Sequence, residues 1–149
     1  YPEYRMADML LEHSETETSI ERMVEYIEAN PDLVGVVGRT GASAITWSRA
    51  KSRAGREDIF AMGMDYSENN LDVLTSGGID ALVCLPLCEA GSVGLELIDS
   101  LLQGAVYQEE EEQWHCELDI RIVTKDGQGQ NGAAYYNAMY ARSAARFGS

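Results

Sequence analysis

Three short apolar runs, at residues 33–38, 59–64 and 80–85, constrain the fold more than any other feature of the sequence. A strand that is apolar along its whole length is typical of a parallel sheet with both faces covered. Segments with helical periodicity separate the runs, and this alternation favours right-handed crossovers within one sheet. The sequence therefore predicts a three-layer α/β fold, a doubly wound parallel sheet flanked by helices, with Val36, Ile59 and Val83 nearly fully buried inside it.

Further segments extend this order towards both ends of the chain. Residues 5–12 read as a short first strand. Apolar residues at helical spacing predict a helix that starts near Ser14 and stops at Asn30-Pro31, because the residue before a proline is disfavoured in a helix. Apolar and charged residues alternate at 118–123, which indicates a half-exposed or edge strand.

The chain is expected to hold one lobe and a short C-terminal extension. A Gly/Gln-rich linker at 128–132 precedes a helix-compatible segment at 133–147. We therefore assign residues 1–127 to the lobe, and 128–149 to the linker and a candidate C-terminal helix. The chain opens on Tyr1 instead of an initiator Met, so we expect it to start inside a longer product.

The charge balance narrows the range of partners. The chain has 11 Lys and Arg residues against 25 Asp and Glu residues, a formal net charge of −14. Such a surface repels nucleic acid and anionic membranes, so this segment is not expected to contact DNA. No apolar run in the sequence approaches the roughly 20 residues that a membrane-spanning helix needs.

Neither a metal site nor a catalytic site is expected. Cys84, Cys88 and Cys116 follow no common zinc spacing, and a free cysteine in an apolar run packs as a small hydrophobic residue. His13 and His115 lie away from the predicted strand ends and have no evident triad partner. Glycine-rich motifs for dinucleotides or nucleoside triphosphates are absent from the sequence. We therefore expect a protein that is not an enzyme and has no catalytic residue, no metal and no cofactor.

Four stretches carry a family resemblance in the right order along the chain. They are EYIEANPDLVGVVG at 25–38, SRAGREDIFAMGMD at 52–65, VLTSGGIDALVCLPLCEAGSVGLELIDSLLQG at 73–104, and RIVTKDG at 121–127. The chain resembles the C-terminal lobe of type I periplasmic binding proteins and the related ligand-binding domains of lactose-repressor-like regulators. This resemblance implies one lobe of a two-lobed binding protein, whose first lobe precedes the present chain.

The resemblance also implies a ligand site. Family members bind their ligand in a cleft between the lobes, and ligands of such sheets lie outside the carboxyl ends of the strands. Asp65 is retained there as a ligand-binding carboxylate. Thr40-Gly41, preceded by Arg39, stands where the family usually has Asn-Asp, and Leu85 stands where it often has Gln. Because these positions differ, the usual clamp on sugar hydroxyls is altered.

Each of the polar positions has an alternative interpretation. Arg39, Thr40 and the start of the following helix could together meet an anion. Arg39 could equally form a surface ion pair with a neighbouring acid. Asp65 could cap the helix that begins near Ser67, because an aspartate is a favoured helix cap.

The resemblance implies a solute-binding protein of an ABC-type transporter, which binds a sugar or another polar solute outside the cytoplasm. The passage from GREDI through AMGMD to TSGGIDALV is closer to transporter receptors than to repressors. The alternative is the effector-binding domain of a cytoplasmic transcriptional regulator, which free cysteines would favour. The expected partners are the ligand, the missing N-terminal lobe, and a transporter permease or a second copy of the chain.

Overall fold

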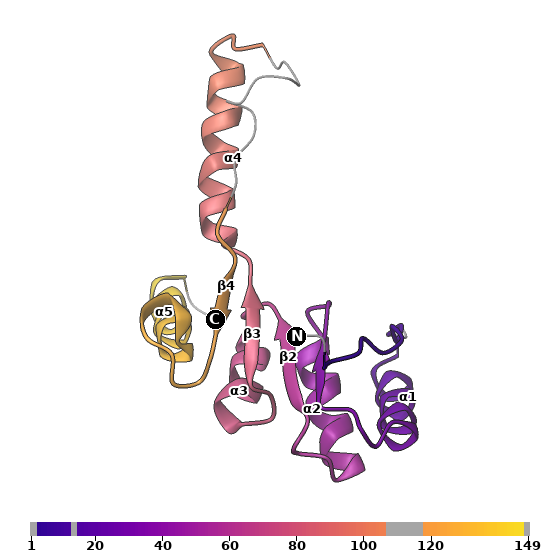
Figure 1. Cartoon of the computed structure of the whole chain (residues 1–149). Coiled ribbons are helices and arrows are strands. Elements are labelled where there is room, and N and C mark those ends of the chain that lie inside the picture. Colours follow the sequence, from indigo (N-terminus) through magenta and orange to yellow (C-terminus); the bar gives the residue numbers. More distant parts are fainter. Residues whose placement is uncertain (1–2, 13–14, 107–117, 148–149) are drawn as a thin grey trace.

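A computed structural model of the chain describes residues 3–12, 15–106 and 118–147 (Figure 1). Its α-helices are α1 (Thr16–Ala29), α2 (Ser43–Ala54), α3 (Glu68–Ser76), α4 (Leu87–Leu102) and α5 (Ala133–Phe147). Its strands are β1 (Gly35–Val37), β2 (Phe60–Met64), β3 (Ala81–Cys84) and β4 (Arg121–Val123). A short 3-10 helix, η2 (Gly129–Asn131), precedes α5.

The four strands form one sheet in the order β1-β2-β3-β4. β1 pairs with β2, and β2 with β3, in parallel, with Val36 opposite Ala61 and Gly63 opposite Leu82. The predicted α/β class and the parallel pairing of the three apolar runs are therefore confirmed. β4 pairs with β3 in the antiparallel direction, which makes the sheet mixed, and an antiparallel edge strand on a parallel sheet is common.

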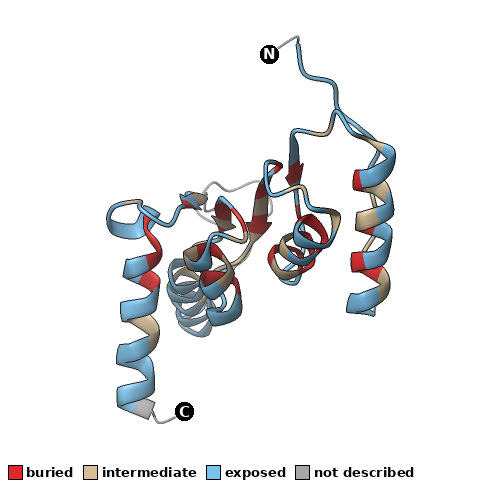
Figure 2. Ribbon diagram, turned by 90° about the horizontal axis from the view of Figure 1, so that it is seen from below, coloured by how far each residue is buried: buried red, intermediate tan, exposed pale blue. Residues whose placement is uncertain are grey.

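The helices that pack on the sheet lie in one row. Contacts join α1 to α2, α2 to α3, and α3 to α5 (Figure 2). Because β1, β2 and β3 are neighbours in chain order, right-handed crossovers carry α2 and α3 to the same face of the sheet. Within the described residues the opposite face stays open, and Phe60 and Ile122 on it are 50% and 45% exposed.

Burial alternates along the strands as a result. Val36 is 9% exposed and Leu82 is fully buried, as expected for side chains that face the helices. Val83 lies opposite Ile122 in the β3–β4 pair and is only half-buried. The prediction that Val83 is fully buried is therefore wrong, because its side chain points to the open face.

The core fills the space between the sheet and the row of helices. A Cβ atom added to Gly63 of β2 would lie 2.6 Å from the Cβ of Ala44 in α2. These two small residues thus let α2 pack directly onto the sheet. Helix α2 is the helix that follows the predicted ligand loop at Arg39 and Thr40. The larger buried side chains of the core are Ile20, Met23, Ile27, Trp47, Ile59, Leu71, Leu74, Leu82, Val123 and Tyr136.

The ends of α2 and α3 follow from their local sequence. Gly55 and Gly77 end these helices with φ angles of 65° and 85°, a left-handed conformation that glycine adopts readily. Ser67 is the N-cap of α3, and its hydroxyl accepts a hydrogen bond from the backbone N–H of Asn70 at 3.4 Å. Glycine after a helix and serine before one are residues that favour these ends.

The segment at residues 5–12 differs from its prediction. It was expected to be a strand, but its described backbone is irregular and pairs with no described strand. Side-chain contacts hold it instead: the Tyr26 hydroxyl donates to the backbone oxygen of Asp8 at 3.3 Å, and the Thr46 hydroxyl donates to the carboxylate of Glu12 at 2.9 Å. Apolar residues alone did not make a strand here, because a strand also needs a neighbour for its backbone hydrogen bonds.

Helix α4 projects away from the rest of the lobe (Figure 1). None of its residues is buried, and Leu95 and Leu102 are 70% and 82% exposed. A Cβ atom added to Gly91 or Gly94 would meet nothing within 4 Å. Among the described residues no helix combines the length and the apolar character that crossing a membrane requires.

Helix α5 begins directly behind the predicted Gly/Gln-rich linker. Ala133 and Tyr136 at its start are 1% and 6% exposed and join the core cluster. From Ala141 to Arg146 the side chains are exposed. The division of the chain after residue 127 stays a prediction.

Candidate functional site

The carboxyl ends of the parallel strands bring two of the predicted site segments together. β1 leads into the loop that holds Thr40 and Gly41, and β2 leads directly into Asp65. A Cβ atom added to Gly41 would lie 3.2 Å from Oδ2 of Asp65, so the carboxylate lies against this loop. Such a strand edge is where open α/β sheets bind their ligands.

Asp65 has a backbone conformation that few residues adopt. Its φ is 69°, and within the described parts of the chain it is the single non-glycine residue with a positive φ. Its N–H donates to the carbonyl of Val83 at 2.9 Å, which ties this position to β3. Asp and Asn visit the left-handed region at lower cost than other non-glycine residues, and strained backbone tends to gather at functional sites.

The alternative role of Asp65 as a helix cap is not seen. Ser67 occupies the N-cap position of α3 and makes the capping hydrogen bond. The carboxylate of Asp65, which is half-buried, is therefore not used to start the helix. Whether it binds a ligand stays a prediction.

Arg39 and Thr40 have different surroundings. Arg39 is exposed, and it forms no ion pair with any residue that the structure describes. Thr40 donates its hydroxyl to the carboxylate of Glu12, which also accepts a hydrogen bond from Thr46. The carboxylate of Glu12, from the same chain, therefore lies at the start of α2, where an anionic ligand was the alternative expectation.

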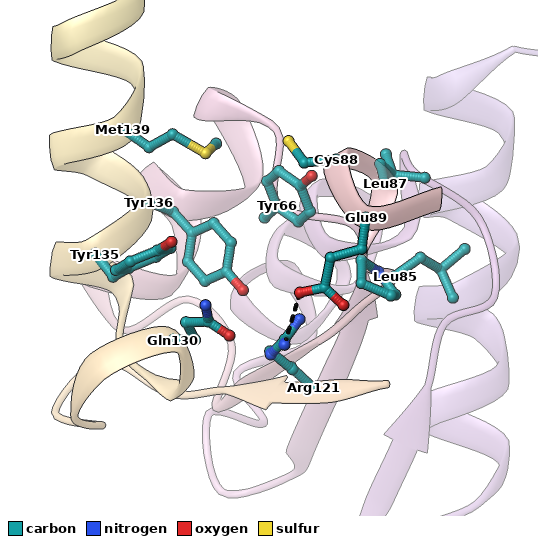
Figure 3. Close-up of a pocket in the computed structure, with 11 residues that line it drawn as sticks. Tyr66, Leu85, Leu87, Cys88, Glu89, Arg121, Gln130, Tyr135, Tyr136 and Met139 are labelled. Atoms are coloured by element: carbon teal, nitrogen blue, oxygen red, sulfur yellow. Dashed lines mark hydrogen bonds and ion pairs between the residues drawn. The ribbon is translucent and has the colours of Figure 1, made fainter. Parts of the chain in front are cut away.

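Leu85 lies at the end of β3, beside a small cavity between α4 and α5 (Figure 3). The cavity has a volume of about 60 Å³, far below the roughly 300–1,000 Å³ of small-molecule sites. Leu85 itself is 39% exposed, so it also faces the outside of the lobe. The polar and aromatic residues that line the cavity include Tyr66, Cys88, Glu89, Arg121, Tyr135 and Tyr136.

Aromatic rings and one ion pair form the walls of this cavity. The ring centroids of Tyr66 and Tyr136 lie 4.7 Å apart, and those of Tyr135 and Tyr136 lie 5.2 Å apart in an edge-on arrangement. Burial raises the pKa of both Tyr66 and Tyr136, so their hydroxyls stay neutral. Arg121 donates to the carboxylate of Glu89 at 2.9 Å, and this hydrogen bond raises the pKa of the guanidinium.

Sequence reasoning did not find these cavity residues. Tyr66 directly follows Asp65, and its place just past a strand end was a signal that could have found it. Tyr136 comes from the segment behind residue 127, which lies outside the family resemblance. Its contact with Tyr66 depends on packing between distant parts of the chain, which no local pattern reveals.

Metal ligation finds no support in the part of the chain that the structure describes, where no group of three or more His, Cys, Asp or Glu residues could hold an ion. Cys84 is buried, and burial raises the pKa of its thiol to about 12. Cys116, His13 and His115 lie outside the described residues. The expectation that the protein has no metal therefore stays a prediction.

Sequence comparison relates the chain to import binding proteins for sugars. No protein family model matches it. The D-apiose import binding protein of Actinobacillus succinogenes is 30% identical over 79% of this chain and 39% of its own length. The ribose import binding protein of Escherichia coli is 25% identical over 69% of this chain and 33% of its own length.

Solved structures show the same fold. An ABC transporter solute-binding protein of Agrobacterium vitis, solved with bound D-fucose, superposes with a TM-score of 0.69 at 22% identity, over 87% of this chain and 43% of its own length. A second one from that species, bound to α-D-tagatopyranose, gives a TM-score of 0.70 at 20% identity, over 83% of this chain and 40% of its own length.

The chain has the fold of one lobe of the two-lobed solute-binding proteins to which it is similar. Its resemblance to type I periplasmic binding proteins is confirmed by sequence and by structure. The chain spans between 33% and 39% of the length of the two import binding proteins.

Proposed function

We propose that the chain is a ligand-binding lobe of a substrate-binding protein that delivers a sugar, or a similar polar solute, to an ABC-type importer. The observation that carries this proposal is the position of Asp65. Its carboxylate lies at the carboxyl end of β2, against Gly41, in a left-handed backbone conformation that the fold must hold in place. An ionised carboxylate only accepts hydrogen bonds, and it can accept them from two neighbouring sugar hydroxyls.

The names of the relatives support the transport interpretation over the regulator. Both sequence relatives are import binding proteins for pentoses, and they align over most of this chain. The free cysteines had favoured the regulator, but Cys84 is buried and its thiol has a pKa of about 12. A buried thiol of this kind resists oxidation in either compartment, so Cys84 says little about location, whereas the free and exposed Cys88 still favours the regulator. An extracytoplasmic location follows from the proposal.

Exposed apolar residues support a second lobe as the main partner. Helix α4 buries none of its residues within the described structure, although Leu95, Ile98 and Leu102 are large and apolar. Exposed apolar surface of this extent marks an interaction site. Since the chain covers 33% to 43% of the proteins it resembles, the rest of such a protein supplies the surface for α4 and the other wall of the cleft. A permease or a second copy as a further partner stays a prediction.

The names of the relatives favour a binding role over catalysis. The relatives are named as binding proteins. We therefore propose that the protein binds its solute without changing it.

Calorimetric titration of the full product of the gene tests this proposal. D-apiose, D-ribose and D-fucose are the probes, because proteins similar to this chain are named for these sugars. We expect at least one of them, or a close stereoisomer, to bind at micromolar concentration. If no sugar binds tighter than about 1 mM while the protein retains operator DNA in a selection from random sequences, the regulator interpretation replaces this one.

A further inference from the structure

We propose that Asn70 is a positioning residue that holds the two loops of the candidate ligand site, at Gly41 and Asp65, in a fixed relation to each other. Asn70 lies in the first turn of α3, and its side chain is fully buried. This inference rests on the proposed function, because it gives Asn70 the task of placing the carboxylate that binds the ligand.

One side-chain amide joins both loops. Nδ2 of Asn70 donates to the carbonyl of Gly41 at 2.9 Å, to that of Met64 at 2.9 Å and to that of Asp65 at 3.3 Å. Gly41 belongs to the loop between β1 and α2, whereas Met64 and Asp65 belong to the end of β2. The amide therefore connects segments that no backbone hydrogen bond of the sheet holds together at this point.

The remaining atom of the amide shows that packing alone does not explain this residue. Oδ1 of Asn70 is buried and has no hydrogen-bond partner among the described residues. An unsatisfied buried acceptor costs free energy that an apolar side chain of similar size would not cost. The opposite orientation of the amide would place Oδ1 against three carbonyl oxygens, so the neighbours fix Nδ2 where it is. What the amide contributes is therefore its set of donated hydrogen bonds.

These hydrogen bonds act on the backbone that carries the ligand carboxylate. The carbonyls of Met64 and Asp65 belong to the peptide groups on the two sides of Asp65. A residue at a φ of 69° stays there only when its surroundings hold it. The hydrogen bonds of Asn70 hold Asp65 in this conformation. Through the carbonyl of Gly41, Asn70 also sets the distance from the carboxylate of Asp65 to the loop between β1 and α2.

A double-mutant cycle in the full product of the gene tests this role. Asn70→Asp keeps the shape of the side chain but replaces the donors with acceptors, and Asn69→Asp makes the same change at an exposed position of α3. Affinity for D-apiose and D-ribose is measured by calorimetry. We expect Asn70→Asp to weaken binding about tenfold, as coupled neighbours do, and Asn69→Asp to leave it unchanged. In an Asp65→Asn background, Asn70→Asp should add less than about twofold.

A loss of equal size in both backgrounds would overturn the proposal, because Asn70 would then act on the whole fold and not through Asp65. Unchanged affinity in Asn70→Asp would overturn it as well. Absence of sugar binding by the unmodified protein would instead count against the proposed function.

Amide hydrogen exchange tests the positioning role of Asn70 without any ligand. In Asn70→Ala, which avoids a buried charge, we expect the amides of Asp65 and Ser43 to exchange at least about tenfold faster. These amides donate to Val83 and Thr40, on the two sides of the site. The amide of Gly78, at the far end of α3, should keep its protection. Equal acceleration at all three amides, or at none, would refute the positioning role.

Discussion

The hydroxyl of Thr40 donates a hydrogen bond to the carboxylate of Glu12, so a group from the same chain already engages one predicted ligand position. Thr46, in the first turns of α2, donates to the same carboxylate at 2.9 Å. A negative charge is favourable at this place, since the start of a helix carries a partial positive charge. The N-terminal segment is thus fastened to the edge of the sheet where the ligand is expected.

Replacement of Glu12 by alanine tests how much the contacts of Glu12 with Thr40 and Thr46 stabilise the folded chain. Glu12→Ala removes the acceptor of both threonine hydroxyls, and we expect the free energy of unfolding to fall by about 1 kcal/mol. Cleavage of residues 5–11 by an added protease should become faster. Glu21→Ala, at an exposed position of α1, is the matched control and should change neither quantity. Equal behaviour of the two variants in urea unfolding would show that the contact contributes nothing.

Two variants at Asp65 separate its charge from its backbone conformation. Asparagine tolerates the left-handed region about as well as aspartate, so Asp65→Asn should keep the melting temperature while sugar affinity falls on the order of tenfold. Asp65→Ala should weaken binding equally and also lower the free energy of unfolding by about 1–2 kcal/mol. Asp72→Asn, on the exposed side of α3, serves as the control. Normal sugar binding by both Asp65→Asn and Asp65→Ala would remove Asp65 from the site and redirect the search to Arg39 and Thr40.

Glycine-to-alanine changes test the packing of α2 on the sheet. A Cβ at position 63 would lie 2.6 Å from the Cβ and 2.9 Å from the Cα of Ala44, so the backbone must shift to admit it. We expect Gly63→Ala to lower the free energy of unfolding by about 1–3 kcal/mol. Gly91→Ala meets open space and removes a glycine from a helix, so in the isolated chain it should stabilise α4 by up to about 1 kcal/mol. Chemical denaturation measures both, and a reversed order would contradict the structure.

The two described cysteines should differ in reactivity. Cys84 is 1% exposed and its thiol has a pKa of about 12, whereas Cys88 is exposed. Iodoacetamide at pH 8 should therefore modify Cys88 and spare Cys84, as mass spectrometry of the digested protein would show. Because the thiol of Cys84 keeps its proton longer in the folded chain, stability should fall as the pH rises above about 9 towards 12. Rapid labelling of Cys84 under native conditions would mean that β3 opens readily.

The sequence predicted those parts of the fold that depend on local pattern. The continuous apolar runs identify β1, β2 and β3, although within the described residues one face of the sheet is open, as the exposure of Phe60 and Ile122 shows. Helix α1 follows from the helical spacing of its apolar residues, and Gly55 and Gly77 end α2 and α3 because glycine readily takes the left-handed conformation of a helix end. These features follow from the nearest neighbours along the chain.

The remainder depends on contacts between distant segments. Residues 5–12 are partly apolar, yet no described strand lies beside them to pair with. The antiparallel direction of β4 depends on the path of the chain through α4, and the sequence of β4 itself does not set it. Asn70 reads as an ordinary polar residue near a helix start, and its three acceptors come together only in the folded lobe.

Titration of the isolated 149-residue chain with the same sugars tests most directly whether it is one lobe of a two-lobed site. A ligand of the cleft needs both walls, and the cavity beside Leu85 holds only about 60 Å³. We predict that the isolated chain binds D-apiose, D-ribose and D-fucose no tighter than about 1 mM, roughly −4 kcal/mol, while the full product of the gene binds at micromolar concentration. Micromolar binding of a sugar by the isolated chain would contradict the two-lobed account.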